Sequence, residues 1–236
     1  MKKIIHLGNT RGVADHGWLH SKHTFSFADY YNPERMHFGV LRVINDDIVE
    51  AGMGFGTHPH NNMEIISIPL EGSLAHKDSM GNSSVITSGE VQIMSAGTGI
   101  THSEFNHSKT DLVNFLQIWV LPKELGIKPR YGQKKFDLSR NKFNLVVTPD
   151  KNSEEAVWIN QDAYFYLAKT DENNTLEYTL NNKNHGLYIF LIDGEIEISD
   201  EKLSKRDAIG ISDLENISIK SLKNSYILLM EVPLEL

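Results

Sequence analysis

The sequence contains no cysteine among its 236 residues. Disulfide scaffolds, Cys-x-x-Cys zinc sites, iron–sulfur clusters and cysteine nucleophiles are therefore excluded. Any bound metal must be held by nitrogen and oxygen atoms. Histidine, in contrast, occurs 11 times, and ten of these residues lie at or before His107. This uneven distribution indicates that any metal chemistry belongs to the first half of the chain.

Long hydrophobic runs and clustered positive charge are also lacking. The strongest apolar stretches, residues 65–70 and 226–230, are far shorter than a membrane span, and no apolar segment follows the lysines near the start. The net charge of −8 is spread evenly, whereas contacts with nucleic-acid phosphates require clustered cations. We therefore expect a soluble, cytoplasmic protein with neither a nucleic-acid nor a membrane partner.

Helical periodicity is scarce, and most apolar segments are short runs of β-branched and aromatic residues between Gly, Asn, Asp and Ser. Such runs predict strands joined by tight turns. A weak internal repeat is also present. Residues 70–74 (LEGSL) resemble residues 192–196 (IDGEI), and residues 89–94 (GEVQIM) resemble residues 206–211 (RDAIGI).

The repeat predicts an all-β protein with two related barrels in one chain. We expect the first barrel over residues 1–130 and the second over residues 131–236. Residues 121–142, which are rich in Pro, Gly and basic side chains, are predicted to connect the two. Because one chain supplies both barrels, we expect a monomer.

Two clusters of histidine and glutamate have the spacing of strand residues on one face. His58 and His60 are separated by one residue, as are His102 and Glu104, so each pair projects to the same side of a strand. If the two strands lie in one barrel, three imidazoles and a carboxylate converge. If the strand continues beyond His60, the same alternation places Glu64 on the face that carries His58 and His60. Spacing alone therefore leaves Glu64 and Glu104 as alternative oxygen ligands.

Three nitrogen ligands and one oxygen ligand suit a divalent first-row transition metal. We favour iron as the bound metal. Nickel, manganese, copper or zinc would also suit these ligands. Four protein ligands on an octahedral metal leave two open positions, as a Lewis-acid or oxygen-activating site requires.

The sequence resembles a known family at these same segments. Residues 52–72 (GMGFGTHPHNNMEIISIPLEG) resemble the first cupin motif, and residues 89–106 resemble the second. More narrowly, THPHNNMEI, LEGSLAHKDSMGN and IMSAGTGITHSE resemble the pirin family, and most of all the bacterial pirin-like quercetin 2,3-dioxygenases. The resemblance is strong over residues 11–131, and the second half resembles a degenerate cupin. It implies a bicupin fold with two double-stranded β-helix barrels.

The resemblance also implies a choice of ligands. In the pirin family three His and one Glu hold the metal, and these carry over to His58, His60, His102 and Glu104. Glu64 then becomes a neighbour that orients a ligand imidazole.

The second barrel is expected to carry no metal. Aligning the repeats places Leu180, Asn182, Ile219 and Ser221 at the four ligand positions, so we expect one metal per chain.

The activity implied by the resemblance is the cleavage of a flavonol such as quercetin by O2, with release of carbon monoxide. Glu104 would act as the general base that takes the hydroxyl proton of this aromatic substrate. Two alternatives stay open. One is a metal-dependent regulatory protein that binds a protein partner without turnover, and the other is a metal-dependent isomerase or hydrolase.

Four further residues are candidates for the substrate pocket. Phe55 and Met53 precede the first histidine pair within a Gly-flanked turn. Gln92 and Gln117 lie inside apolar strands, where a polar group needs a partner. These amides would contact substrate or metal-bound water, although a structural hydrogen bond explains them equally well. Histidines without ligand spacing, among them His23, His76 and His107, are expected at the surface or beside a ligand.

Overall fold

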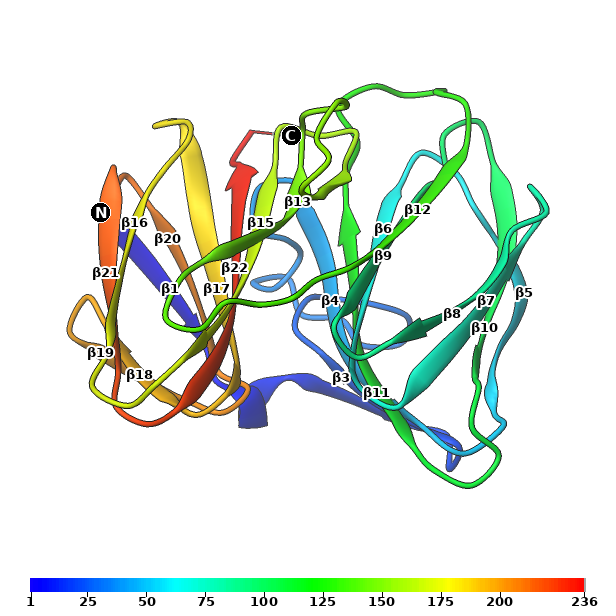
Figure 1. Cartoon of the computed structure of the whole chain (residues 1–236), viewed down its shortest axis with the longest axis horizontal. Coiled ribbons are helices and arrows are strands. Elements are labelled where there is room, and N and C mark those ends of the chain that lie inside the picture. The colour runs from blue at the N-terminus through cyan, green and yellow to red at the C-terminus, as the bar shows by residue number, and fades with distance from the viewer. Residues whose placement is uncertain (236) are drawn as a thin grey trace.

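The structure, a computed structural model, describes residues 1–235. Within these residues the regular secondary structure is β-strand apart from one short 3-10 helix, η1 (Gly8–Thr10). The strands form two barrels that lie side by side (Figure 1). The prediction of an all-β, two-barrel fold is confirmed. No helix in the described residues has the length and apolar character needed to cross a bilayer.

The first barrel consists of a seven-stranded and a four-stranded sheet among the described residues. The larger sheet has the order β12 (Arg130–Lys135), β9 (Glu90–Ser95), β6 (Glu64–Glu71), β11 (Val113–Val120), β4 (Leu41–Val49), β3 (Leu19–His23) and β2 (Gly12–Asp15). The smaller sheet has the order β5 (Gly54–His60), β10 (Ile100–Asn106), β7 (Ser73–Asp78) and β8 (Ser83–Thr87).

The second barrel repeats this arrangement within the described residues. Its larger sheet has the order β1 (Lys2–His6), β20 (Ala208–Ser212), β17 (His185–Asp193), β22 (Ser225–Pro233), β15 (Tyr164–Thr170), β13 (Asn144–Thr148) and β14 (Val157–Trp158). Its smaller sheet has the order β16 (Thr175–Thr179), β21 (Asn216–Ser221), β18 (Glu195–Ile198) and β19 (Glu201–Ser204). Strands β9, β6 and β11 thus correspond to β20, β17 and β22, as the internal repeat predicts.

Two glycines occupy equivalent turns in the barrels. Gly72 follows β6 with φ of 74°, and Gly194 follows β17 with φ of 97°. A Cβ atom on Gly72 would lie 2.6 Å from the carbonyl oxygen of Leu112, and one on Gly194 would lie 2.5 Å from that of Asn224. Both turns therefore require glycine, because its backbone adopts positive φ and leaves room for the neighbouring chain.

The largest hydrophobic cluster lies between the barrels, where the two larger sheets pack back to back (Figure 1). Ile66 and Leu116 contribute from the first barrel, and Tyr188 and Leu228 from the second. The central strands are thus covered on one face by this interface and on the other by their own barrel interior. This double burial explains why they lack the alternating pattern of half-exposed strands.

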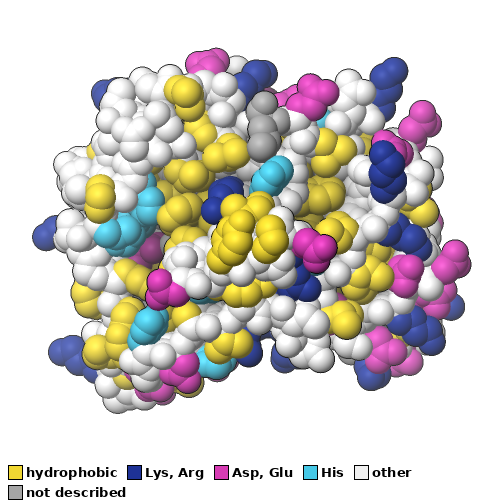
Figure 2. Space-filling model, turned by 180° about the vertical axis from the view of Figure 1, so that it is seen from behind, with side chains coloured by type: hydrophobic (Ala, Val, Ile, Leu, Met, Phe, Trp, Pro, Cys, Tyr) yellow, Lys and Arg dark blue, Asp and Glu magenta, His cyan; other side chains and the backbone are white. Residues whose placement is uncertain are grey.

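The two interiors differ in polarity. The second is filled by Ile, Leu and other apolar side chains, whereas the first also contains buried His, Asp, Glu, Asn and Gln. Most histidines visible from behind the molecule likewise lie over the first barrel (Figure 2). In the second barrel Leu176 pairs with Ile219 as His58 pairs with His102, so Leu176 and Tyr178, rather than Leu180 and Asn182, replace the first histidine pair.

Edge strands are exchanged between the two halves of the chain, which differs from the predicted division at residues 130 and 131. β1 comes from the N-terminus but pairs with β20 in the second barrel, and β12 comes from the predicted connector but pairs with β9 in the first. Each exchanged strand covers the backbone groups of a sheet edge that would otherwise lie open. Each barrel therefore contains one strand from the part of the sequence assigned to the other barrel or to the connector.

Candidate metal centre

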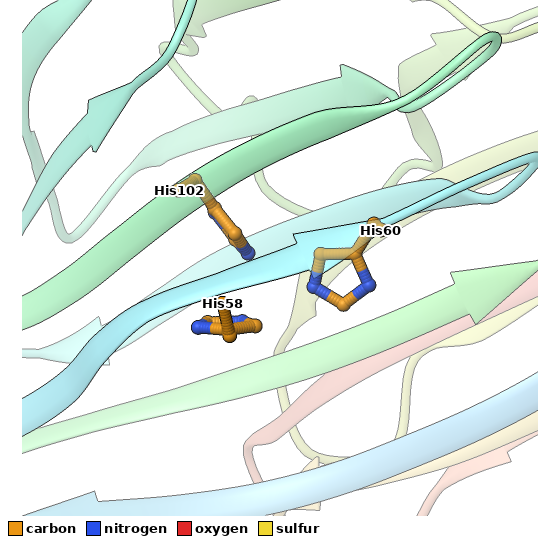
Figure 3. A group of neighbouring side chains, drawn as sticks. All are labelled: His58, His60 and His102. Carbon is orange, nitrogen blue, oxygen red and sulfur yellow. The ribbon is translucent and has the colours of Figure 1, made fainter.

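The three predicted imidazoles converge inside the first barrel (Figure 3). His58 and His60 project from β5, and His102 projects from the adjacent strand β10, directly opposite His58. The ring centroid of His58 lies 4.9 Å from that of His60 and 4.4 Å from that of His102, and the His60 and His102 centroids are 4.9 Å apart. One ring nitrogen from each of the three lies within 4.8 Å of the others.

The electrostatic environment keeps two of these imidazoles, His60 and His102, neutral. Burial, together with the neighbouring His58, His60 and His76, lowers the pKa of His102 to about 2. Burial, followed by the proximity of His58, lowers the pKa of His60 to about 4. A neutral imidazole offers the nitrogen lone pair that a metal ligand needs. His60 and His102 are thus suited to bind a metal cation.

The hydrogen bonds of the cluster also fit a metal. Both ring nitrogens of His102 are buried and have no hydrogen-bond partner among the described residues. Nδ1 of His58 lies 2.8 Å from the carbonyl oxygen of Gly56, which fixes the ring and leaves Nε2 free. Because buried polar atoms are otherwise almost always paired, the vacant nitrogens of His102 support a metal ligand role.

Glu104 lies on β10 one pleat beyond His102 and is fully buried. Gln117 on β11 donates to its Oε2 over 2.6 Å, and the hydroxyl of Ser67 on β6 donates to its Oε1 over 3.1 Å. Burial raises the pKa of Glu104 to about 7 against the effect of these two hydrogen bonds. A carboxyl group with this pKa can accept a proton near neutral pH, as a general base must.

His76 on β7 is a member of the cluster that its spacing in the sequence did not reveal. It lies directly opposite Glu104, and ligand atoms of His76, His102 and Glu104 all lie within 4.8 Å of one another. Its Nε2 is 3.2 Å from the Asp78 carboxylate. The imidazole on an alternating strand (LAHKD) was visible in the sequence, but the pairing of β7 with β10 was not.

The predicted position of Glu64 is wrong. β5 ends at His60, the chain turns through Asn62 with φ of 45°, and Glu64 begins β6 in the other sheet. Its Oε2 accepts hydrogen bonds from Ser95 Oγ at 2.7 Å and from the backbone N–H of Asn160 at 3.1 Å. Strand alternation does not continue through such a turn, so Glu64 faces the second half of the chain rather than the imidazoles.

The other residues predicted for the substrate pocket differ in whether they line a cavity beside the imidazoles. Phe55 and Gln117 line a cavity beside the imidazoles. Gln92 is fully buried, and its amide has no hydrogen-bond partner among the described residues. Met53 is 43% exposed and does not line this cavity, because it precedes β5 in the turn at the barrel surface.

The cavity has an empty volume of about 420 Å³, including the part open to solvent. Apolar and aromatic side chains form part of its wall, with polar side chains between them. The lining residues are Leu19, Ser21, His23, Phe27, Asn45, Asp47, Phe55, His58, His60, Glu104, Gln117 and Trp119. This mixed apolar and polar lining suits a small organic molecule next to the metal centre.

A row of polar side chains crosses the inner face of the larger sheet. Going from β3 to β9, His23 pairs with Asn45, Asn45 with Gln117, Gln117 with Ser67, and Ser67 with Gln92. Directly opposed residues of antiparallel strands share one face. Sequence reasoning identified only the two glutamines, although polar residues at alternate positions of apolar strands marked the others.

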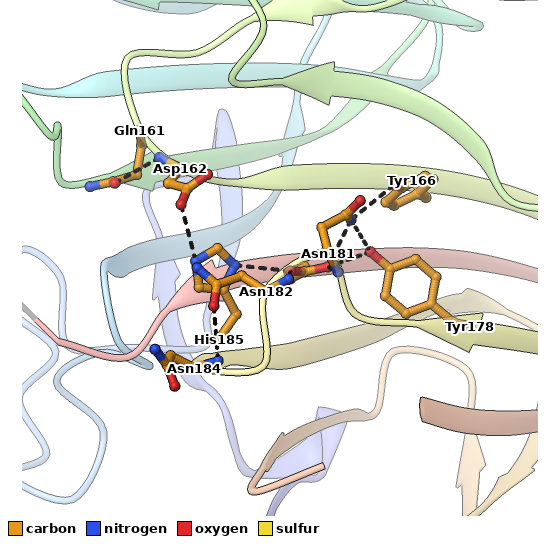
Figure 4. Close-up of polar contacts among 9 residues, drawn as sticks. Gln161, Asp162, Tyr166, Tyr178, Asn181, Asn182, Asn184 and His185 are labelled. Atoms are coloured by element: carbon orange, nitrogen blue, oxygen red, sulfur yellow. Dashed lines mark hydrogen bonds and ion pairs between the residues drawn. The ribbon is translucent and has the colours of Figure 1, made fainter. Parts of the chain in front are cut away.

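A second buried polar cluster lies in the second barrel (Figure 4). His185 Nδ1 is 2.9 Å from the Glu231 carboxylate, and its Nε2 is 3.5 Å from that of Asp162. The Tyr178 hydroxyl donates to Glu231 over 2.6 Å, and the backbone N–H groups of Asn181 and Asn182 donate over 3.0 Å. These bonds tie the turn before β17 to β22, which is a structural role.

Comparison with known proteins reveals similarity over both barrels. Residues 6–120 match the family described as Pirin, and residues 145–232 match the family described as Quercetinase C-terminal cupin domain. A quercetin 2,3-dioxygenase of Escherichia coli (strain K12) is 46% identical over 226 residues, which cover 95% of this chain and 96% of that protein.

Solved structures show the same extent of similarity. The crystal structure of YhhW from Escherichia coli has a TM-score of 0.94 and 43% identity, with full coverage of both chains. The structure of bacterial pirin YhhW in complex with nickel(II) has a TM-score of 0.93 and 43% identity, and covers 98% of this chain and 99% of that one.

Proposed function

Because this chain belongs to the pirin family, we propose that it is a mononuclear metal-dependent dioxygenase. Its substrate would be a flavonol such as quercetin, cleaved by O2 with release of carbon monoxide. The observation that carries the proposal is the convergence of three imidazoles, two of which, His58 and His60, line a cavity together with aromatic side chains. The name of the Escherichia coli relative, quercetin 2,3-dioxygenase, supports the same activity.

One divalent metal per chain would be held by His58, His60 and His102, with Glu104 as the fourth ligand. The donor set suits iron, nickel, manganese, copper or zinc. Iron is our first choice, and the nickel(II) complex of YhhW makes nickel a direct competitor. When bound, the metal supplies a Lewis acid that lowers the pKa of a coordinated hydroxyl group.

The residues of the chain position the substrate and handle its proton. Phe55 and Trp119 line the cavity, and the Trp119 ring lies edge-on to His60 with centroids 4.9 Å apart. These rings offer flat apolar contacts to an aromatic substrate. The carboxylate of Glu104 would accept the substrate's hydroxyl proton on an oxygen whose orientation is fixed by Ser67 and Gln117.

The proposal is tested by reconstituting the purified protein with each of the five metals and mixing it with quercetin in air. We expect metal-dependent loss of flavonol absorbance and release of carbon monoxide. His60→Ala should abolish both, whereas His107→Ala, which alters an exposed histidine, should not. Absence of turnover with every metal at full occupancy would overturn the dioxygenase and favour a regulatory protein with a protein partner.

The assignment of the oxygen ligand needs its own measurement, because Glu64 and Glu104 were alternatives in the sequence. We expect Glu104→Ala to weaken metal binding and Glu64→Ala to leave it unchanged, as measured by competition with a chelator. The reverse result would show that the assignment is wrong.

A further inference from the structure

One wall of the cavity is polar but carries none of the proposed metal ligands. It is formed by Ser21 and His23 on β3 and by Asn45 and Asp47 on β4. Ser21 lies directly opposite Asp47, and His23 directly opposite Asn45. All four residues are buried, with between 1% and 4% of their surface exposed. The dioxygenase mechanism described above uses none of them.

This wall contains polar atoms that the protein does not satisfy. Within the described residues, Oδ1 of Asn45 and Nδ1 of His23 are buried without a hydrogen-bond partner. The Asp47 carboxylate accepts a hydrogen bond from the Ser21 hydroxyl, which orients it. Unpaired buried polar atoms are costly, so their presence at a cavity wall supports a bound molecule that hydrogen-bonds to them, with Asn45 Oδ1 as an acceptor.

The neighbouring residue Asp46, on the same strand, has the contacts expected of a carboxylate with a structural role. Asp46 forms an ion pair with Arg206, whose Nε is 2.8 Å away, and accepts a hydrogen bond from Asn114 Nδ2 over 2.8 Å. It thus joins β4 to β11 and to the second barrel. Asn45 and Asp47, on either side of Asp46, point into the cavity and have no comparable set of partners. Their burial is therefore not explained by holding the fold together.

We propose that Asn45 and Asp47 form a subsite that recognises substrate hydroxyl groups other than the one that reacts. The inference rests on the proposed function and narrows its substrate class. The aromatic lining of Phe27, Phe55 and Trp119 accommodates a flat ring, the imidazole side receives the reacting oxygen atoms, and the acceptor-rich wall receives donor hydroxyls. The substrate expected from this lining is therefore an aromatic compound with at least one hydroxyl group besides the one that reacts.

The expected selectivity follows from the chemistry of an unpaired acceptor. A ligand that lacks this second hydroxyl leaves the buried Asn45 Oδ1 and the Asp47 carboxylate without a donor from the ligand. Such sites discriminate more strongly against a missing hydroxyl than apolar pockets do against a missing methylene. Specificity should therefore depend on the pendant hydroxyls of the ligand more than on its size.

Three flavonols that differ only in the pendant ring provide the test. Quercetin has two hydroxyls on this ring, kaempferol has one and galangin has none. Calorimetric dissociation constants are measured with the metal-loaded protein in the absence of oxygen, so that no turnover occurs. We expect quercetin to bind about tenfold more tightly than galangin, with kaempferol between them.

The variants Asn45→Leu and Asp47→Asn alter the wall, and Ser21→Ala removes only the hydroxyl that orients Asp47. Each should reduce the preference for quercetin over galangin while the affinity for galangin changes little. Asp29→Asn, which alters an exposed carboxylate, is the matched control and should keep the full preference. Metal content and thermal unfolding are measured for every variant, and Ser21→Ala keeps the test valid if the larger changes prevent folding.

The outcomes separate the subsite from the proposed function. Equal affinity for the three flavonols in the wild type, or a preference unchanged in all folded wall variants, would overturn the subsite even if quercetin is turned over. If no flavonol binds, the proposed function fails, and 4-methylcatechol, p-cresol and toluene are compared instead. A hydroxyl preference lost in the variants would then support the subsite, and its absence, or no binding at all, would overturn it.

Discussion

Gln117 and Glu104 are joined by a hydrogen bond of 2.6 Å inside the first barrel, with the amide of Gln117 as the donor. The same glutamine accepts a hydrogen bond from the Ser67 hydroxyl over 2.8 Å, and this hydroxyl shares its one proton with Glu104 Oε1, 3.1 Å away. Two strands of the larger sheet, β11 and β6, and strand β10 of the smaller sheet are thus linked around a single carboxylate. Gln117 and Ser67 thus both help to orient the Glu104 carboxylate.

Gln117→Leu should therefore separate metal binding from turnover. The three imidazoles remain, so we expect one metal per chain to be retained. Without its donor, Glu104 is free to rotate, and kcat with a flavonol should fall about tenfold or more, as for other positioning changes at a general base. Elemental analysis and steady-state kinetics check these two expectations.

The control for this change is Gln133→Leu on β12. The Gln133 amide donates to the Val85 carbonyl oxygen and to Glu90, each over 3.1 Å, and accepts from the Tyr131 hydroxyl over 2.7 Å. None of these bonds involves Glu104, so the loss of the Gln133 amide should leave kcat near the wild-type value. Loss of metal from Gln117→Leu, or an unchanged kcat, would show that Gln117 does not act through the position of Glu104.

His76→Phe tests the imidazole that the spacing in the sequence did not reveal. The change keeps a ring against Tyr131, whose centroid lies 4.8 Å from that of His76, but removes the nitrogens near His102 and Glu104. Residues that support ligands typically change metal affinity about 10-fold to 100-fold when mutated. We expect a loss in this range by chelator competition. The exposed His107→Phe should show none, and an equal loss in both variants would contradict the role of His76.

The fold and the imidazole cluster could be predicted because each rests on local patterns. The i and i+2 spacing of His58 and His60 on a strand fixes their common face, whatever the strand pairs with. The turn glycines Gly72 and Gly194 mark equivalent points of the two repeats, since both turns need positive φ. These features depend on a few neighbouring residues and therefore appear directly in the sequence.

Features that depend on strand pairing between distant segments could not be predicted. The position of His76 beside Glu104 follows from the register of β7 on β10, and the subsite of Asn45 and Asp47 follows from the closure of the barrel. The placement of Glu64 failed for a related reason, because alternation was continued through a turn that changes sheets. The exchange of β1 and β12 likewise follows from which sheet edges lie open.

Glu64 should make stability depend on pH between acid and neutral conditions. Burial raises its pKa from 4.5 to about 7, against the hydrogen bonds from Asn160 and Ser95. Its proton therefore stabilises the folded state below about pH 4.5, and this contribution is lost as the pH rises through about 7. The Glu64→Gln variant stays neutral at every pH, so it should not lose this contribution to stability as the pH rises.

We therefore expect Glu64→Gln to be more stable than the wild type at pH 8, by up to about 3 kcal/mol since one pKa unit corresponds to about 1.4 kcal/mol. At pH 4 the two should be nearly equal. Urea unfolding at both pH values measures the difference. Glu71→Gln, at the exposed end of the same strand, should follow the wild type at both, and parallel curves for all three proteins would contradict the role of Glu64.

Glu231 should have the opposite pH dependence. Its pKa is lowered from 4.5, although burial acts in the other direction, because His185, Tyr178 and Asn181 all hydrogen-bond to the carboxylate. Its contribution to stability is present above pH 4.5 and is lost as the pH falls through the lowered pKa. Glu231→Gln should lower the free energy of unfolding by about 2–4 kcal/mol at pH 7, because it leaves buried donors facing a neutral amide.

This deficit should shrink in acid, where the wild-type carboxylate is itself protonated. Glu177→Gln, which alters an exposed glutamate beside Tyr178 on β16, should change stability little at either pH. Since the Glu231 cluster lies in the second barrel, Glu231→Gln should keep its full metal content and its flavonol turnover once folded. A loss of metal from folded Glu231→Gln would show instead that this cluster supports the centre in the first barrel.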